Sequence, residues 1–149
     1  SPSQLHCKPG EVVKKKTVNG KKVKYCAPAQ ASGLTDDELY EQGRLLAKEG
    51  RYEWALDVLA QVQNKSDPKV LNYMGYANRK AGRFDVAFGY YKKALELNPD
   101  FVLAREYLGE GYVAAGRKDL AQAQLAEIAT RCGVTCSEYK DLAETIAAN

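Results

Sequence analysis

Three small residues recur along this chain at nearly constant intervals, and this repetition constrains the fold more than any other feature. The recurring positions are a first glycine (Gly43, Gly75, Gly109), a second glycine (Gly50, Gly82, Gly116) and an alanine (Ala55, Ala87, Ala121). Each set advances by 32 and then by 34 residues. A shared internal period of this length indicates stacked copies of one supersecondary unit.

Each copy is predicted to be a pair of helices joined by a short turn. Apolar residues follow the second glycine at helical spacing, as in Ala87, Tyr91 and Ala94. The second glycine would end the first helix, and the other two small residues would let helices approach closely. Thr35 with Glu38 forms a capping box that starts the array. The copies are predicted at about 36–67, 68–101 and 102–135.

A further helix is predicted over about 137–148, with Ser137 as its N-cap and one apolar stripe through Leu142 and Ile146. A repeat array needs such a helix to cover its last unit.

The second copy resembles the tetratricopeptide repeat family. The matching residues are Leu71, Met74, Gly75, Gly82, Phe84, Ala87, Tyr91, Ala94, Leu95 and Pro99. The third copy matches at Leu108, Gly109, Tyr112, Gly116 and Ala121. The resemblance implies a mainly α fold of three tandem helix-turn-helix repeats plus a C-terminal capping helix. It is specific for the fold and names no partner.

Residues 1–33 are predicted to be a separate N-terminal extension, with the repeat domain at 34–149. This segment holds seven lysines and one acid, so it carries +6 in a chain whose net charge is +3. Asn19-Gly20 between two Val- and Lys-rich runs predicts a β-hairpin in which Val18 pairs with Lys21. Its basic side chains are Lys14, Lys15, Lys16, Lys21, Lys22 and Lys24.

These lysines have several interpretations. They could contact an anionic membrane surface or an acidic partner, or they could simply keep strand edges from aggregating. Nucleic acid is the weakest candidate, because the hairpin has no arginine and one aromatic residue, Tyr25.

The four cysteines lie as one pair near each end of the chain. We expect Cys7–Cys26 to close the open end of the hairpin and Cys132–Cys136 to fix the capping helix. Four free thiols in a cytosolic protein are the alternative. Disulfides would indicate an oxidising compartment. Together with a loose resemblance to small exported bacterial tetratricopeptide proteins, this predicts a periplasmic or secreted bacterial protein whose signal peptide has been removed.

Catalysis is not expected. His6 is the single histidine, in a terminal segment, and no phosphate-binding glycine loop or hydrolase motif occurs. The cysteine spacings do not suit structural zinc. We therefore predict no catalytic residue, no metal and no cofactor.

The family resemblance implies a groove lined by the first helix of each repeat, where a protein or peptide partner would bind. Its predicted contacts are Tyr40, Arg44, Asn72, Tyr73, Tyr76, Arg79, Lys80, Glu106, Tyr107 and Glu110. Some members of the family bind acidic C-terminal peptides through a clamp of lysine, asparagine and arginine side chains. Arg44 is the one cation at the matching positions here, so binding of such C-terminal peptides is not supported. Trp54 is expected either to anchor the hairpin or to form a second contact site.

Two functions compete. The chain is predicted to be a non-enzymatic scaffold or adapter of the periplasm or cell envelope, as a monomer or weak homo-oligomer. The alternative is a structural module tethered by its Lys-rich hairpin to a membrane surface or an acidic partner.

Overall fold

The structure is a computed structural model that describes residues 5–149. The chain divides into two compact units, Ser1–Lys65 and Ser66–Asn149, which are described separately. Within the described residues it has two strands, seven α-helices and one short 3-10 helix. None of these helices has the length and apolar character needed to cross a membrane.

The first unit begins with the predicted hairpin. Strands β1 (Glu11–Val18) and β2 (Lys21–Pro28) are antiparallel, and Val18 pairs with Lys21 as expected. Asn19 and Gly20 both have positive φ, 49° and 75°, which a two-residue turn requires. The Cys7–Cys26 disulfide joins the segment before β1 to β2. A 3-10 helix, Ala29–Ala31, follows.

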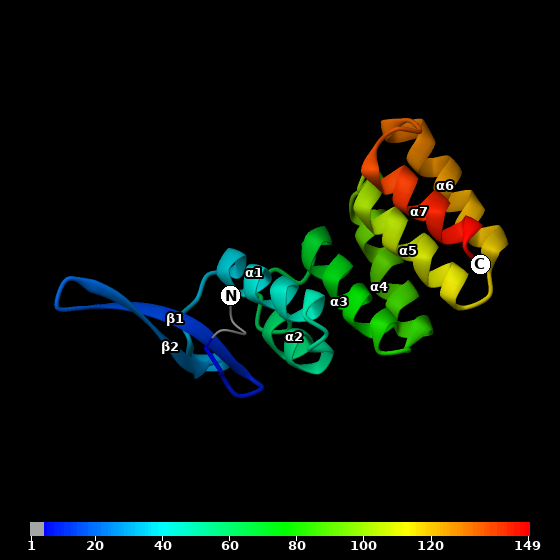
Figure 1. Ribbon diagram of the computed structural model, residues 1–149. Helices are drawn as coiled ribbons and strands as arrows, with labels where there is room; N and C mark the ends of the chain where they lie inside the picture. The colour runs from blue at the N-terminus through cyan, green and yellow to red at the C-terminus, as the bar shows by residue number, and fades with distance from the viewer. Residues whose placement is uncertain (1–4) are drawn as a thin grey trace. The chain divides into compact units, whose positions relative to one another are not determined.

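Helices α1 (Asp36–Lys48) and α2 (Tyr52–Leu59) complete this unit (Figure 1). The predicted capping box is present, because Thr35 Oγ1 accepts from the Glu38 amide at 3.2 Å and Glu38 Oε1 accepts from the Thr35 amide at 3.0 Å. Gly50 ends α1 with a φ of 85°.

Two side chains attach the hairpin to these helices. The Gln42 amide accepts from the Val13 N–H at 2.8 Å and donates to the Val13 carbonyl at 2.6 Å. Trp54 Nε1 donates to the Glu11 carbonyl at 2.8 Å, and the indole is buried. Trp54 therefore anchors the hairpin, which is one of its two expected roles.

The second unit holds α3 (Pro68–Lys80), α4 (Phe84–Leu97), α5 (Val102–Ala114), α6 (Lys118–Cys132) and α7 (Ser137–Ala147). Helix α5 is central, since it packs against the other four (Figure 1). Gly75 lies against Tyr91 and Gly109 against Leu142, so the first glycine marks close helix contacts as predicted.

The capping helix α7 covers α5 and α6, with Leu142 and Ile146 buried. The Cys132–Cys136 disulfide closes the loop before it. The expectation that Ser137 is the N-cap is wrong. Cys136 occupies that position, and Ser137 is already helical. The predicted domain boundary after residue 33 stays a prediction. The hairpin shares its compact unit with α1 and α2.

Candidate partner-binding surface of the repeat unit

Three tyrosines that were predicted to line a groove form one cluster between α3 and α5. The ring centroids of Tyr73, Tyr76 and Tyr107 are 5.1–6.0 Å apart. The hydroxyl oxygens of Tyr73 and Tyr107 are 3.5 Å apart. Each residue is less than 10% exposed. The rings therefore pack mainly on one another and hold the two helices at a fixed spacing.

Arg79 joins this cluster to the core and to α5. Its guanidinium carbon lies 5.3 Å from the Tyr76 ring centroid and 5.7 Å from that of Tyr107. Its Nε donates to the Tyr91 hydroxyl at 3.2 Å, and its Nη2 pairs with Glu110 Oε2 at 3.5 Å. Burial disfavours the charged guanidinium, but Tyr91 and Glu110 outweigh that effect and raise the pKa of Arg79.

Glu106 lies one turn before Glu110 on α5 and is buried. Burial raises the pKa of its carboxyl to about 9, with smaller contributions from Glu110, Asp141 and Glu138. At neutral pH Glu106 therefore carries a proton and hydrogen-bonds to Glu110. The acidic cluster on α5 and α7 (Glu106, Glu110, Glu138 and Asp141) is therefore less negative at neutral pH than its four carboxyl groups alone would indicate.

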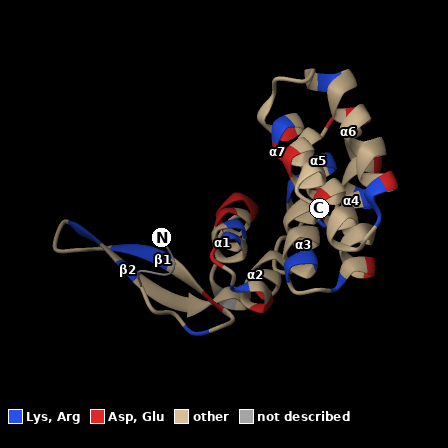
Figure 2. Ribbon diagram, turned by 45° about the vertical axis from the view of Figure 1, so that its right-hand side comes forward, with Lys and Arg blue, Asp and Glu red and all other residues tan. Residues whose placement is uncertain are grey.

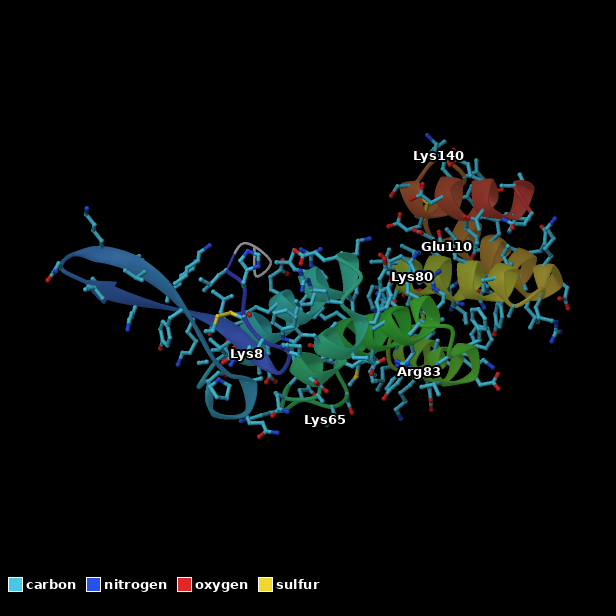
Figure 3. All side chains as sticks on the ribbon, turned by 60° about the horizontal axis from the view of Figure 1, so that its bottom comes forward. Lys8, Lys65, Lys80, Arg83, Glu110 and Lys140 are labelled. Carbon is cyan, nitrogen blue, oxygen red and sulfur yellow. A yellow bond between two sulfur atoms is a disulfide. The ribbon has the colours of Figure 1, made fainter. Side chains whose placement is uncertain are left out.

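A cleft of about 310 Å³ opens beside this network and draws on three successive first helices. Helix α3 contributes Arg79 and Lys80, and α5 contributes Glu110. Val113 and Ala114 of α5, Thr145 of α7 and Asn149 also line it. Lys80 is exposed, with its Nζ 5.8 Å from the Tyr76 ring centroid. Figure 3 labels Lys80 and Glu110 on their two helices.

Eight of the ten predicted contacts lie on α3 and α5, and seven of these form or adjoin the cluster and the cleft. They are Tyr73, Tyr76, Arg79, Lys80, Glu106, Tyr107 and Glu110. Tyr40 and Arg44 lie on α1 in the first unit, where Arg44 pairs with Glu41 at 2.5 Å. Asn72 is fully buried, and neither polar atom of its amide has a hydrogen-bond partner among the described residues. A partner could reach that amide only if it became uncovered.

Helix α7 contributes to the cleft although no residue of it was among the predicted contacts. Thr145 and Asn149 line the cleft, yet the predicted contacts ended with the third repeat. A signal existed in the 34-residue period. One more step along the chain from α5 leads to the segment that forms α7, which packs beside α5 as a further first helix would.

Both predicted disulfides are present. Among the residues that the structure describes, one group could offer three metal ligands: Cys132, Cys136 and Glu138. Both sulfurs of that group are joined to each other, so neither is a thiolate.

The chain was compared with known proteins. Residues 68–101 match the family model described as "Tetratricopeptide repeat". The crystal structure of MamA is 17% identical with a TM-score of 0.64, and the match covers 76% of this chain and 67% of that one. The Yersinia enterocolitica type III secretion translocator chaperone SycD is 18% identical with a TM-score of 0.64, covering 76% and 85%.

The first TPR domain of human RPAP3 is also similar in structure. It is 18% identical with a TM-score of 0.65, and the match covers 76% of this chain and 94% of that domain. At these identities the likeness shows the fold. The family pattern of residues 68–101 lies within that shared fold, on α3 and α4. Residues 68–101 are therefore a tetratricopeptide repeat, within a fold that is similar to those of these three proteins.

Proposed function

We propose that this protein is a non-enzymatic adapter that binds a segment of a partner protein on the face formed by α3, α5 and α7. One of its structural relatives, SycD, is a type III secretion translocator chaperone. The observation that carries the proposal is the cleft to which three successive first helices contribute, with Lys80 and Glu110 of opposite charge on its wall. A surface built from several repeats suits an extended or helical segment rather than a small molecule.

The chemistry of the face favours a partner segment with a cation opposite α5. Glu106 and Glu110 are close enough to share a proton, and Glu138 and Asp141 of α7 act on the same carboxyl. A lysine or arginine from the partner would offset this like-charge repulsion and let Glu106 ionise. Lys80, on the other side of the cleft, would pair with an acidic group of the same segment.

We also propose that the adapter works in the bacterial periplasm or cell envelope. Two disulfides in a chain of 149 residues support an oxidising compartment, because reducing systems keep cytosolic thiols free.

Site-specific photocrosslinking in the envelope fraction of the source cells tests this proposal. A benzophenone amino acid replaces exposed Ala114, which lines the cleft, and in a matched control replaces exposed Lys93 on α4. We expect a protein to be captured at Ala114 and not at Lys93. Lys80→Glu should reduce that capture, and Lys93→Glu should not. Equal capture at both positions, or capture unaffected by Lys80→Glu, would place the partner elsewhere.

A further inference from the structure

Strand β1 has one edge that does not face β2. In an antiparallel pair closed by a two-residue turn, hydrogen-bonded pairs alternate with non-hydrogen-bonded ones, starting from the pair next to the turn. That pair is Val18 with Lys21, and the register continues without a bulge to Glu11 and Pro28. The N–H and C=O groups of the odd-numbered residues of β1 therefore point away from β2. These residues are Glu11, Val13, Lys15 and Thr17.

Side chains of the helices fill the first half of this edge. Trp54 binds the carbonyl of Glu11, and Gln42 binds both backbone groups of Val13 as a neighbouring strand would. The second half has no such cover. Lys15 and Thr17 are exposed, and no side chain or backbone group of the described residues hydrogen-bonds to their outward groups.

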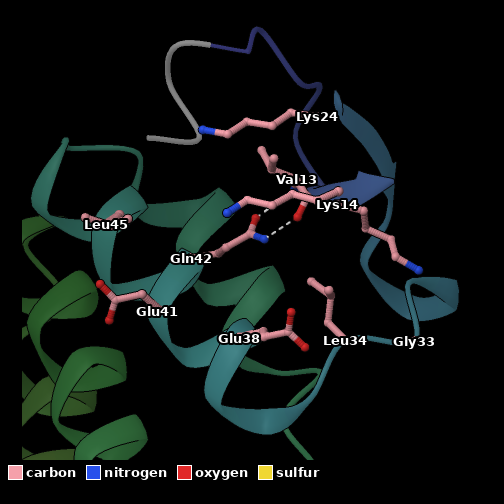
Figure 4. A pocket seen from close by; sticks show the side chains of 10 residues that line it. Val13, Lys14, Lys24, Gly33, Leu34, Glu38, Glu41, Gln42 and Leu45 are labelled. Carbon is pink, nitrogen blue, oxygen red and sulfur yellow. Dashed lines mark hydrogen bonds between the residues drawn. The ribbon is translucent and has the colours of Figure 1, made fainter. Parts of the chain in front are cut away.

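A cleft of about 470 Å³ lies between this edge and α1, as Figure 4 shows. Its apolar lining comes from Val13, Leu34 and Leu45. Lys14, Lys15 and Lys24 also line it. An extended chain on the open half of β1 would thus meet alternating backbone groups, apolar surface and ammonium groups.

The positive charge of this cleft is not neutralised by ion pairs. Lys14, Lys15 and Lys24 form none among the described residues. Two carboxylates also line the cleft and offset part of this charge, since Lys14 and Lys15 contribute to lowering the pKa of Glu38 after its hydrogen bonds to Thr35, but each carboxylate also has another partner. Glu38 closes the capping box with Thr35, and Glu41 pairs with Arg44. Figure 2 shows the basic residues spread along both strands.

We propose that an extended, acidic segment of a partner protein adds to β1 as a third strand at Lys15 and Thr17, with its carboxylates over the cleft lysines. Strand addition takes its affinity from backbone hydrogen bonds and its specificity from alternate side chains. A second copy of the chain fits poorly, because pairing two β1 edges would bring lysines onto lysines. The site lies in the first unit and does not depend on the proposed repeat surface.

Fluorescence anisotropy with a labelled peptide tests this proposal. The probe is an alternating Glu-Val peptide of eight residues, and its controls are a Lys-Val peptide and a Glu-Val peptide N-methylated at alternate residues. We expect the Glu-Val peptide to bind, and the N-methylated peptide to bind at least about tenfold more weakly because it cannot complete the ladder. The Lys-Val peptide should not bind.

Two sets of protein variants locate the site. The cleft variant is Lys14→Gln with Lys15→Gln and Lys24→Gln, and the matched outer variant is Lys16→Gln with Lys21→Gln and Lys22→Gln. Both remove three positive charges, yet only the cleft variant should weaken the Glu-Val peptide by about tenfold or more. Thr17→Pro should do the same by removing an outward donor, whereas Thr17→Ala should not.

Several outcomes would overturn the proposal. Equal losses in the cleft and outer variants, or equal affinity for the N-methylated peptide, would mean unspecific charge attraction. Failure of the Glu-Val peptide to bind, with binding to phosphatidylglycerol vesicles that the outer variant abolishes, would make the hairpin a membrane contact. A dimer in sedimentation that Thr17→Pro dissociates would make a second copy the occupant.

Discussion

Gly75 is placed where any side chain would collide with the core. A Cβ at this position would lie 2.8 Å from Cε1 of the Tyr91 ring, which is itself fully buried. The ring cannot withdraw easily, because its hydroxyl accepts a hydrogen bond from Arg79 at 3.2 Å. The packing of α3 against α4 therefore requires a glycine at position 75, the first glycine of the second repeat.

This packing predicts that Gly75→Ala lowers the free energy of unfolding by about 1–3 kcal/mol. The matched control is Gly89→Ala on α4, where a new Cβ meets no other atom within 4 Å. That variant should be neutral, or more stable by up to about 1 kcal/mol through helix propensity. Urea titrations followed by circular dichroism measure both. Equal effects of the two substitutions would contradict the packing argument.

The buried carboxyl of Glu106 predicts a pH dependence of stability. Its pKa is about 9 in the folded protein and near 4.5 in the unfolded chain. Between these values the folded state binds more protons than the unfolded state, so the free energy of unfolding falls as pH rises. Glu106→Gln keeps a neutral side chain at every pH. Its free energy of unfolding minus that of the parent protein should therefore be roughly 1–3 kcal/mol larger at pH 8 than at pH 4.5.

Thermal unfolding at pH 4.5, 6 and 8 tests this expectation. Glu144→Gln, at an exposed position on α7, is the control and should follow the parent protein. A pH profile of Glu106→Gln parallel to that of the parent would show that Glu106 is ionised in the folded state.

At the scale of elements, the hairpin is held by a few groups at its base. The side-chain amide of Gln42 on α1 hydrogen-bonds to both backbone groups of Val13. The indole N–H of Trp54 on α2 donates to the carbonyl of Glu11. Val12 between them is almost fully buried. The exposed outer half depends on the turn and on the pairing of β1 with β2.

We predict that Gln42→Ala accelerates hydrogen exchange of the Val13 amide by about tenfold or more, because that amide loses its acceptor. The amides of Val12 and Lys14 face β2 and should change much less. Gln63→Ala, on an exposed side chain of the same unit, is the control. NMR-detected exchange gives each amide separately, and unchanged protection at Val13 would contradict the role of Gln42.

Several elements could be predicted because their signals are local. Asn19-Gly20 fixes the turn and therefore the register of the hairpin, and Gly50 and its repeats end the first helices. The contact of Gln42 with Val13 joins residues 29 positions apart and has no such signature. The repeat pattern placed Tyr73 and Tyr107 on the correct helices, but it did not show that the rings bury each other.

At the scale of the whole molecule, each compact unit contains one disulfide. Cys7–Cys26 spans 19 residues and Cys132–Cys136 spans 4. A longer loop restricts the unfolded chain more, so the first bond contributes more stability on the chain-entropy account. The fold therefore depends on the redox state of its surroundings mostly through the hairpin unit.

Cys7→Ser with Cys26→Ser should lower the stability of the hairpin unit by about 3 kcal/mol, and Cys132→Ser with Cys136→Ser should cost the repeat unit about 2 kcal/mol. Amide exchange under non-reducing conditions assigns each loss to a unit, with Val12 and Leu142 as buried reporters. Losses of equal size, or a loss at Leu142 in the first variant, would contradict this division.

The anchoring of the hairpin at its base also affects how the chain can vary during evolution. The contacts that hold the hairpin all lie near its open end: they come from Gln42, Trp54 and the Cys7–Cys26 disulfide. The residue pairs closer to the turn are therefore not needed to attach the hairpin to the helices. Insertions or deletions of two residues in each strand would change the reach of the hairpin and leave its base untouched, because side-chain faces and hydrogen-bonded pairs both repeat every two residues. One residue added to each strand would instead move every lysine beyond it to the opposite face and turn the backbone groups of Val13 from Gln42 toward β2. Homologous hairpins with the same base and turn should therefore differ in length by multiples of two residues in each strand.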